Sequence, residues 1–190
     1  MKIKNFFGHL KTVCKHKYWV GKYCFKIGLY KQGITHDLSK FSPIEFWEGV
    51  KYWQGTRSPI DACKEENGMS LAWQHHKGRN RHHYEYFVDN LDNGGTAIQM
   101  PFINATELIA DYLGAGRAYM GKNFSYQAEY EWWLNKKKKP LLMHPQTKKF
   151  VDLVLYNLTQ KKENLILNKN ALKRLYKKAE REVKSCQSSN

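Results

Sequence analysis

Hydrophobic positions recur at helical spacing along most of the chain, and we identify no convincing strand pattern and no internal repeat. The clearest case is residues 3–27, where Val13, Val20, Tyr23 and Ile27 follow one another at intervals suited to one helix face. Such a stripe predicts an amphipathic helix that packs against a core.

Capping and helix-breaking residues divide the rest of the chain into further helices. Residues 42–45, Ser-Pro-Ile-Glu, have the form of a capping box with proline at the first helical position, which predicts a helix start. Asn80 is expected to cap a helix, and Asn104 with Glu107 another. We expect a compact all-α bundle of about seven to nine helices. Further helices are predicted at 35–41, from residue 58, at 71–77 and near 126–137, 146–160 and 170–185.

Composition is that of a folded protein without membrane contact. A hydrophobic fraction of 42% in 190 residues is enough for one core and excludes a mostly disordered chain. No apolar run approaches the ~18 residues of a membrane span, and His9 and Lys11 interrupt the basic N-terminus where a signal peptide would be apolar. The four cysteines form no Cys-x-x-Cys pair, so neither disulfides nor a cysteine zinc site is indicated. We therefore expect a cytoplasmic protein.

Positive charge is concentrated at the C-terminal end. Of the net charge of +15, residues 136–190 carry +11, with 15 lysines and arginines against four acidic residues. We predict a domain at 1–160 and a basic helical extension at 161–190. Solvated lysines explain this bias most simply, and nucleic-acid binding is the alternative.

Histidine and aspartate stand together in the segment Thr35-His36-Asp37-Leu38-Ser39-Lys40. Adjacent residues on a helix point about 100° apart, so His36 and Asp37 can reach one ion only at a helix end. The two carboxylate oxygens of Asp37 could also bridge two ions. Lys40 would face the same site and hold an anionic oxygen. A hydrogen-bonded surface pair is the alternative explanation of this dipeptide.

Four histidines lie within nine residues, at His75, His76, His82 and His83. Imidazole is a preferred ligand of zinc, iron and similar ions. Positions seven apart are about 10 Å apart along a straight helix, too far for one ion. We therefore expect a break at Gly78, with the later pair opening a new helix. An exposed basic surface is the alternative, but the density of histidines favours metal binding.

Two further positions complete a candidate ligand set. His16 falls on the apolar stripe of the first helix, whereas His9 lies off it. Asp111 shares a helix face with small residues, where a packed carboxylate needs a compensating cation. Arg117, six residues later, is nearly opposite on the helix and is a poor partner. A metal ion or another arginine would have to compensate Asp111.

Taken in order, these residues resemble the ligands of HD-domain proteins, which are all-helical metal enzymes and mostly phosphohydrolases. A lysine three residues after the His-Asp pair also matches. More closely, the chain resembles an uncharacterised bacterial and phage family, a domain of unknown function, through the motifs HDLSKFSPxEF at 36–46 and HHxxxNxHH at 75–83. The resemblance covers about residues 15–120. The 20-residue gap between His16 and His36 is short for an HD protein, so His9, 27 residues before His36, competes as first ligand.

The resemblance implies a mononuclear or dinuclear site for Mn, Fe, Zn, Ni, Co or Mg. Its metal ligands would be His16, His36, Asp37, His76, His82, His83 and Asp111, with His82 and His83 as alternatives. One ion would be held by His16, His36, Asp37 and Asp111, and the other by Asp37, His76 and one of His82 and His83. Asp37 and Lys40 would be catalytic. The substrate would be bound by Lys40, Arg79, Asn80 and Arg117.

The implied activity is metal-dependent hydrolysis of a phosphomonoester or phosphodiester. The substrate would be a small phosphorylated compound, a nucleotide or a nucleotide-derived signal, in the cytoplasm of the bacterium or of the host of a phage. Two alternatives remain: a di-iron oxygenase with the same ligands, and a non-enzymatic, metal-stiffened module whose basic C-terminal helices bind nucleic acid.

Overall fold

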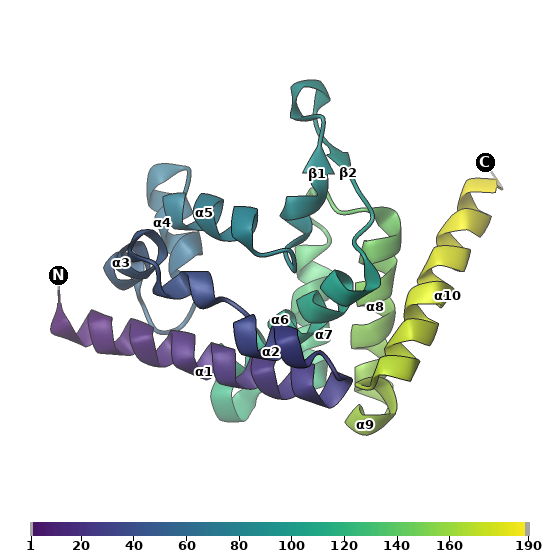
Figure 1. Cartoon of the computed structure of the whole chain (residues 1–190), viewed down its shortest axis with the longest axis horizontal. Coiled ribbons are helices and arrows are strands. Elements are labelled where there is room, and N and C mark those ends of the chain that lie inside the picture. Colours follow the sequence, from purple (N-terminus) through teal and green to yellow (C-terminus); the bar gives the residue numbers. More distant parts are fainter. Residues whose placement is uncertain (1, 189–190) are drawn as a thin grey trace.

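The computed structural model of this chain describes residues 2–188 and is almost entirely helical, which confirms the all-α prediction (Figure 1). The α-helices of this part are α1 (Ile3–Ile27), α2 (Tyr30–Thr35), α3 (Pro43–Tyr52), α4 (Pro59–Asn67), α5 (Leu71–Arg79), α6 (Phe102–Met120), α7 (Tyr126–Lys136), α8 (Pro145–Gln160), α9 (Glu163–Ile166) and α10 (Lys169–Ser188). Short 3₁₀ helices are η1 (Leu38–Phe41), η2 (Tyr84–Phe87), η3 (Leu91–Asn93) and η4 (Gly121–Asn123). The strands β1 (Val88–Asp89) and β2 (Thr96–Ala97) form one small antiparallel hairpin.

Helices α1 and α6 form the close central pair of the fold. At their crossing, a Cβ atom on Gly114 would lie 2.3 Å from Cγ2 of Val20 and 3.0 Å from its backbone nitrogen, so this position accepts only glycine. His16 and Asp111 each lie about one turn from this crossing. The tight contact therefore sets the distance between two of the candidate metal ligands.

The main hydrophobic core lies between α1, α6, α7, α8 and α10. Leu113 of α6, Trp133 of α7, Phe150 of α8 and Leu172 of α10 are all fully buried in it. Figure 1 shows α10 running beside α8 at the edge of the molecule that is remote from the N-terminus. The C-terminal segment is thus part of the same core, and nucleic-acid binding by its lysines stays a prediction.

Several element boundaries differ from the predictions around the histidines. The helix expected at 35–41 does not form, because α2 ends at Thr35 and η1 begins only at Leu38. Gly78 lies within α5, and the chain leaves that helix at Asn80, which is its C-cap and not the N-cap of a following helix. His82 and His83 consequently lie in a turn before η2.

Neither predicted capping box forms, although α3 begins at Pro43 as expected. The Ser42 hydroxyl makes no capping bond, and α6 begins at Phe102, before Asn104. Glu45 and Glu107 are buried instead and hydrogen-bond histidine side chains. Charged partners in the interior override the local preference of both carboxylates for a helix N-terminus.

Among residues 2–188, no helix combines the length and the apolar character needed to cross a membrane.

Glu129 of α7 is a buried carboxylate, only 4% exposed. It packs so closely on α6 that a Cβ atom on Gly116 would lie 2.0 Å from its Oε2. Burial, together with a smaller effect of the nearby Asp111, raises the pKa of Glu129 to about 8. An unfolded chain loses this proton near pH 4.5. Between these pH values the folded state binds more protons, so its stability falls as the pH rises.

We predict that Glu129→Gln, which keeps the shape and cannot ionise, flattens this pH dependence. Above pH 8 the variant should be more stable than wild type by on the order of 2–4 kcal/mol. Urea unfolding at pH 5, 7 and 8.5 measures the effect, with the exposed Glu131→Gln on the same helix as control. Parallel stability curves for wild type and Glu129→Gln would contradict the prediction.

Candidate metal centre

The His36-Asp37 pair forms the short non-helical connection between α2 and η1, where the helical path of the chain is interrupted; we call this connection the break. Asp37 has a φ of +54°, in the left-handed region, which is uncommon for a residue other than glycine. The ammonium of Lys17 on α1 donates to the carbonyls of Ile34 (2.6 Å) and His36 (2.9 Å) and so ties this break to α1. The change of backbone direction lets two adjacent side chains converge, as a regular helix would not.

One cluster of potential ligands joins α1, the break and α6. Nε2 of His16 lies 3.1 Å from Oδ2 of Asp37 and 3.1 Å from Oδ1 of Asp111. Nε2 of His36 lies 3.3 Å from Nε2 of His16 and 3.4 Å from each of the same two oxygens. Ligands about 2.1 Å from a common ion lie roughly 3.0–3.4 Å from one another. This group can therefore hold a metal ion, and all its members are buried.

A second cluster uses the other oxygen of the same aspartate. Nε2 of His76 and Nε2 of His82 each lie 3.3 Å from Oδ1 of Asp37. His83 completes the group, and its ligand atoms all lie within 4.8 Å of one another. The structure thus brings both His82 and His83 to the centre. Asp37 is shared, with one oxygen facing each cluster.

Unpaired buried atoms support the fit of a cation at the second cluster. Oδ1 of Asp37, Nε2 of His82 and Nε2 of His83 are buried and have no hydrogen-bond partner among the described residues. Leaving a buried polar atom unpaired costs about 1–3 kcal/mol. A carboxylate oxygen and two imidazole nitrogens are ligands that a divalent transition-metal ion prefers. The donor set therefore fits such an ion.

Glu107 of α6 contacts one histidine of each cluster through the ring nitrogen, Nδ1, that does not face Asp37. Its Oε1 lies 3.0 Å from Nδ1 of His36 and 3.3 Å from Nδ1 of His82. When Glu107 accepts from both Nδ1–H groups, a metal ion can take the place of the proton on each Nε2. One carboxylate thus fixes the tautomer of a ligand in each cluster.

Glu45 of α3 has the equivalent role for His76. Its carboxylate accepts from Nδ1 of His76 at 2.7 Å and from Nδ1 of His75 at 2.6 Å. His75 is therefore a partner of Glu45 and belongs to neither cluster. Asn80 donates to Ser39 Oγ and to the carbonyl of His76, both at 2.8 Å. Asn80 thus braces the end of α5, which is a different role from the predicted substrate contact.

The charge balance favours ionised carboxylates around the centre. Burial raises the pKa of Asp111, but hydrogen bonds from His16 and His36 outweigh it, so this pKa lies well below its usual value. Burial lowers the pKa of His83 far below its usual value, and the neighbouring His82 and His76 lower it further. Burial also lowers the pKa of His36 and His76, but Asp37 outweighs it and raises both above the usual value, so a metal ion that binds them displaces a proton from each.

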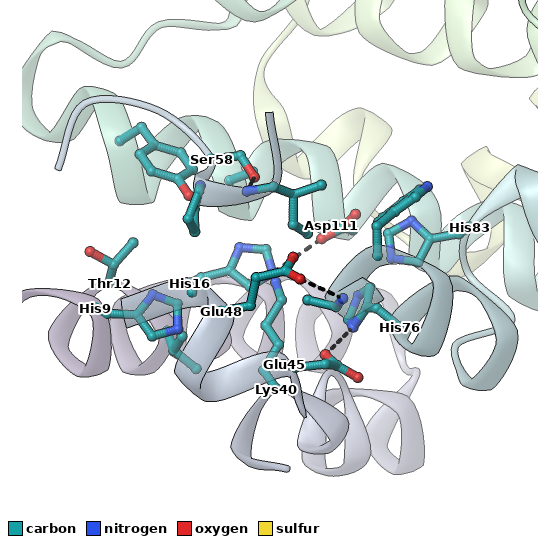
Figure 2. A pocket seen from close by; sticks show the side chains of 18 residues that line it. His9, Thr12, His16, Lys40, Glu45, Glu48, Ser58, His76, His83 and Asp111 are labelled. Atoms are coloured by element: carbon teal, nitrogen blue, oxygen red, sulfur yellow. Dashed lines mark hydrogen bonds and ion pairs between the residues drawn. The ribbon is translucent and has the colours of Figure 1, made fainter. Parts of the chain in front are cut away.

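A cavity of about 180 Å³ opens beside the centre (Figure 2). Its walls include the ligands His16, His76, His83 and Asp111. Lys40 also lines it, with its Nζ 2.6 Å from Oδ2 of Asp37. Burial lowers the pKa of Lys40, but Asp37 and Asp111 outweigh it and raise this pKa above its usual value. Lys40 therefore places a fixed positive charge where a ligand of the metal centre would bind.

Three other predicted residues are not part of the two clusters. His9 is not a member of either cluster, although it is buried on the same side of α1 as His16, contrary to the expectation that it lies off that face. Arg79 is exposed and does not line the cavity. Arg117 donates to the Tyr23 hydroxyl at 3.0 Å and also lies outside the cavity wall. The predicted substrate contacts of Arg79 and Arg117 are therefore not supported.

The fold and the centre together define a class: an all-helical protein with a buried imidazole–carboxylate cluster that could hold metal ions. The model of one family, described as a family of unknown function (DUF5662), matches residues 5–157, so the chain belongs to that family. The matched range contains every candidate ligand. No curated protein and no solved structure matches the chain.

We predict that the two clusters can be emptied separately. His16→Ala removes a ligand of one cluster and His76→Ala a ligand of the other, so each should reduce the metal content from about two ions per chain to about one. Asp37→Ala should abolish binding of both. Elemental analysis of untagged protein purified without chelator measures the content. His144→Ala, at the N-cap of α8 and outside both clusters, is the control. Full metal content in Asp37→Ala would contradict the shared role.

We predict that Glu107→Gln lowers the affinity for both metal ions about 10–100-fold, because the neutral amide accepts more weakly from the two Nδ1–H groups. The matched variant Glu45→Gln should weaken chiefly the ion beside His76. Competition with a chromophoric chelator measures both affinities. Equal effects of the two variants on a single ion would show that Glu107 does not connect the clusters.

Proposed function

We propose that the protein is a metal-dependent phosphohydrolase with a dinuclear centre. The observation that carries this proposal is the position of Asp37, whose two oxygens face two separate groups of buried ligands. Paired sites of this kind suit displacement at phosphorus, where one side must activate water and the other must offset charge. The order of the ligands along the chain, which resembles that of HD-domain proteins, also supports it.

Divalent ions bound at the two clusters would lower the pKa of a water molecule and polarise a phosphoryl oxygen. The protein itself would orient the imidazole ligands and offset the negative charge of the phosphoryl group. Lys40 is directed at the cavity from beside Asp37, so its ammonium can bind a phosphoryl oxygen and stabilise the charge that develops on it. Glu107 and Glu45 keep the imidazoles oriented while the substrate binds.

The composition of the centre favours particular metals. Five imidazoles and two carboxylates make up the two clusters. Imidazole suits zinc, iron, nickel and cobalt, whereas sites for magnesium are built mainly from oxygen ligands. We therefore expect a transition metal, with manganese, iron and zinc as the first ions to assay.

We predict that manganese-loaded protein hydrolyses small phosphomonoesters and that Asp37→Ala abolishes this activity. Lys40→Ala should reduce kcat by about 100-fold, the usual effect of removing one group that stabilises transition-state charge. Arg79→Ala, at an exposed position outside the cavity, should leave the rate unchanged. A phosphate-release assay over a panel of monoesters measures all four proteins. Hydrolysis that survives in Asp37→Ala, or none in any metal-loaded sample, would contradict the proposal.

A di-iron oxygenase is the second candidate, and the imidazole-rich ligand set favours it because such ligands also suit iron. Iron content and oxygen uptake of anaerobically purified protein separate the two functions. Consumption of oxygen with an organic substrate, without release of phosphate, would favour the oxygenase.

A further inference from the structure

His9 is a buried histidine that the metal centre does not use. It lies on α1, is 6% exposed and lines the same cavity as His16. Its Nδ1 is buried without a hydrogen-bond partner among the described residues. Its ring makes an edge contact with Phe46, with the ring centroids 5.3 Å apart. Neither ring nitrogen of His9 has a hydrogen-bond partner among the described residues, so a compound in the cavity can supply one.

Residues of α3 pack against the ring of His9 and restrict its position. A Cβ atom on Gly49 of α3 would lie 2.3 Å from both Cε1 and Nε2 of His9, so only glycine leaves room for the imidazole. Phe46 contacts the ring from the same helix. Burial lowers the pKa of His9 to about 4, with a further contribution from Lys40. The ring is therefore neutral at physiological pH and offers one donor and one acceptor.

The position of His9 gives the length of a ligand that would reach it. His9 and His16 are seven residues apart on one helix, which corresponds to about 10 Å along the axis. Figure 2 shows His9 at one end of the row of labelled side chains and His83 and His76 at the other, with Lys40 between. A compound bound to the metal centre by one end can thus present its other end to His9.

The size and charge of the cavity limit the compound further. Pockets for drug-sized ligands have volumes of about 300–1,000 Å³, whereas this cavity has about 180 Å³. Among the described residues that line it, Lys40 is the one lysine or arginine, and Glu45 and Glu48 are acidic. The protein offers a chain of several phosphates little positive charge, and the small volume favours a compound smaller than a nucleotide.

We propose that this cavity binds the phosphomonoester of a small hydroxylated compound and that His9 hydrogen-bonds its distal hydroxyl. The proposal rests on the phosphohydrolase function proposed above and narrows its substrates to monoesters with a hydroxyl group at the distal end, in place of the nucleotides expected from the sequence. The phosphoryl group lies at the metal centre beside Lys40, and a spacer of about three carbons separates it from the hydroxyl at His9. His9 selects the substrate and takes no part in the displacement at phosphorus.

Calorimetry with inert phosphonates on manganese-loaded protein tests the proposal. Methylphosphonate reaches the metal centre alone, whereas 3-hydroxypropylphosphonate also reaches His9. Wild type should bind the longer compound about 3- to 10-fold more tightly, the value of one net hydrogen bond. His9→Phe, which keeps an aromatic ring, should lose this preference while methylphosphonate binding and metal content stay unchanged. His9→Gln should retain part of it.

Three other results would contradict the proposal in part or as a whole. No preference for the hydroxyl in wild type, or a preference that His9→Phe retains, would overturn the role of His9 alone. Tighter binding of adenosine monophosphate than of 3-hydroxypropylphosphonate would overturn the size limit. Failure of metal-loaded wild type to bind either phosphonate would overturn the phosphohydrolase proposal and the substrate class with it. Should His9→Phe fail to fold, the comparison of ligands on wild type and on His9→Gln still decides.

Discussion

The position of Asp37 is the constraint on which the rest of the centre depends. Its left-handed backbone conformation directs one carboxylate oxygen to the cluster containing His16 and the other to the cluster containing His76. Three segments far apart in sequence, on α1, α5 and α6, must therefore approach the same short connection between α2 and η1. Two features make that approach possible. Gly114 allows α1 and α6 to pack closely, and Lys17 hydrogen-bonds the backbone carbonyls at the connection.

The interior around Asp37 contains many buried polar side chains, and most of them have a hydrogen-bond or ion-pair partner. Glu107 and Glu45 each bond two imidazoles on the side away from Asp37. Charged groups are retained in an interior only when partners offset the loss of hydration. Of the eight unpaired buried side-chain atoms among the described residues, three lie at the second cluster and one is Nδ1 of His9.

The sequence was sufficient for the helical class, for most helix boundaries outside the histidine segments and for the set of residues that converge. It failed where tertiary partners override local preference. Glu45 and Glu107 have the spacing of capping residues, and only the folded chain shows that they face histidines instead. Glu107 lies four residues before Asp111, on the same helix face, and that spacing could have identified it. Arg79 and Arg117 were placed by charge alone, which says nothing about the direction of a side chain.

The most direct test of a shared Asp37 is a crystal structure of the chelator-free protein, with anomalous diffraction measured at the absorption edge of the metal it contains. The account predicts two anomalous peaks, one among His16, His36 and Oδ2 of Asp37, the other beside Oδ1 of Asp37 near His76 and His82. A single peak that Asp37 does not contact, or none with only water among the imidazoles, would contradict it.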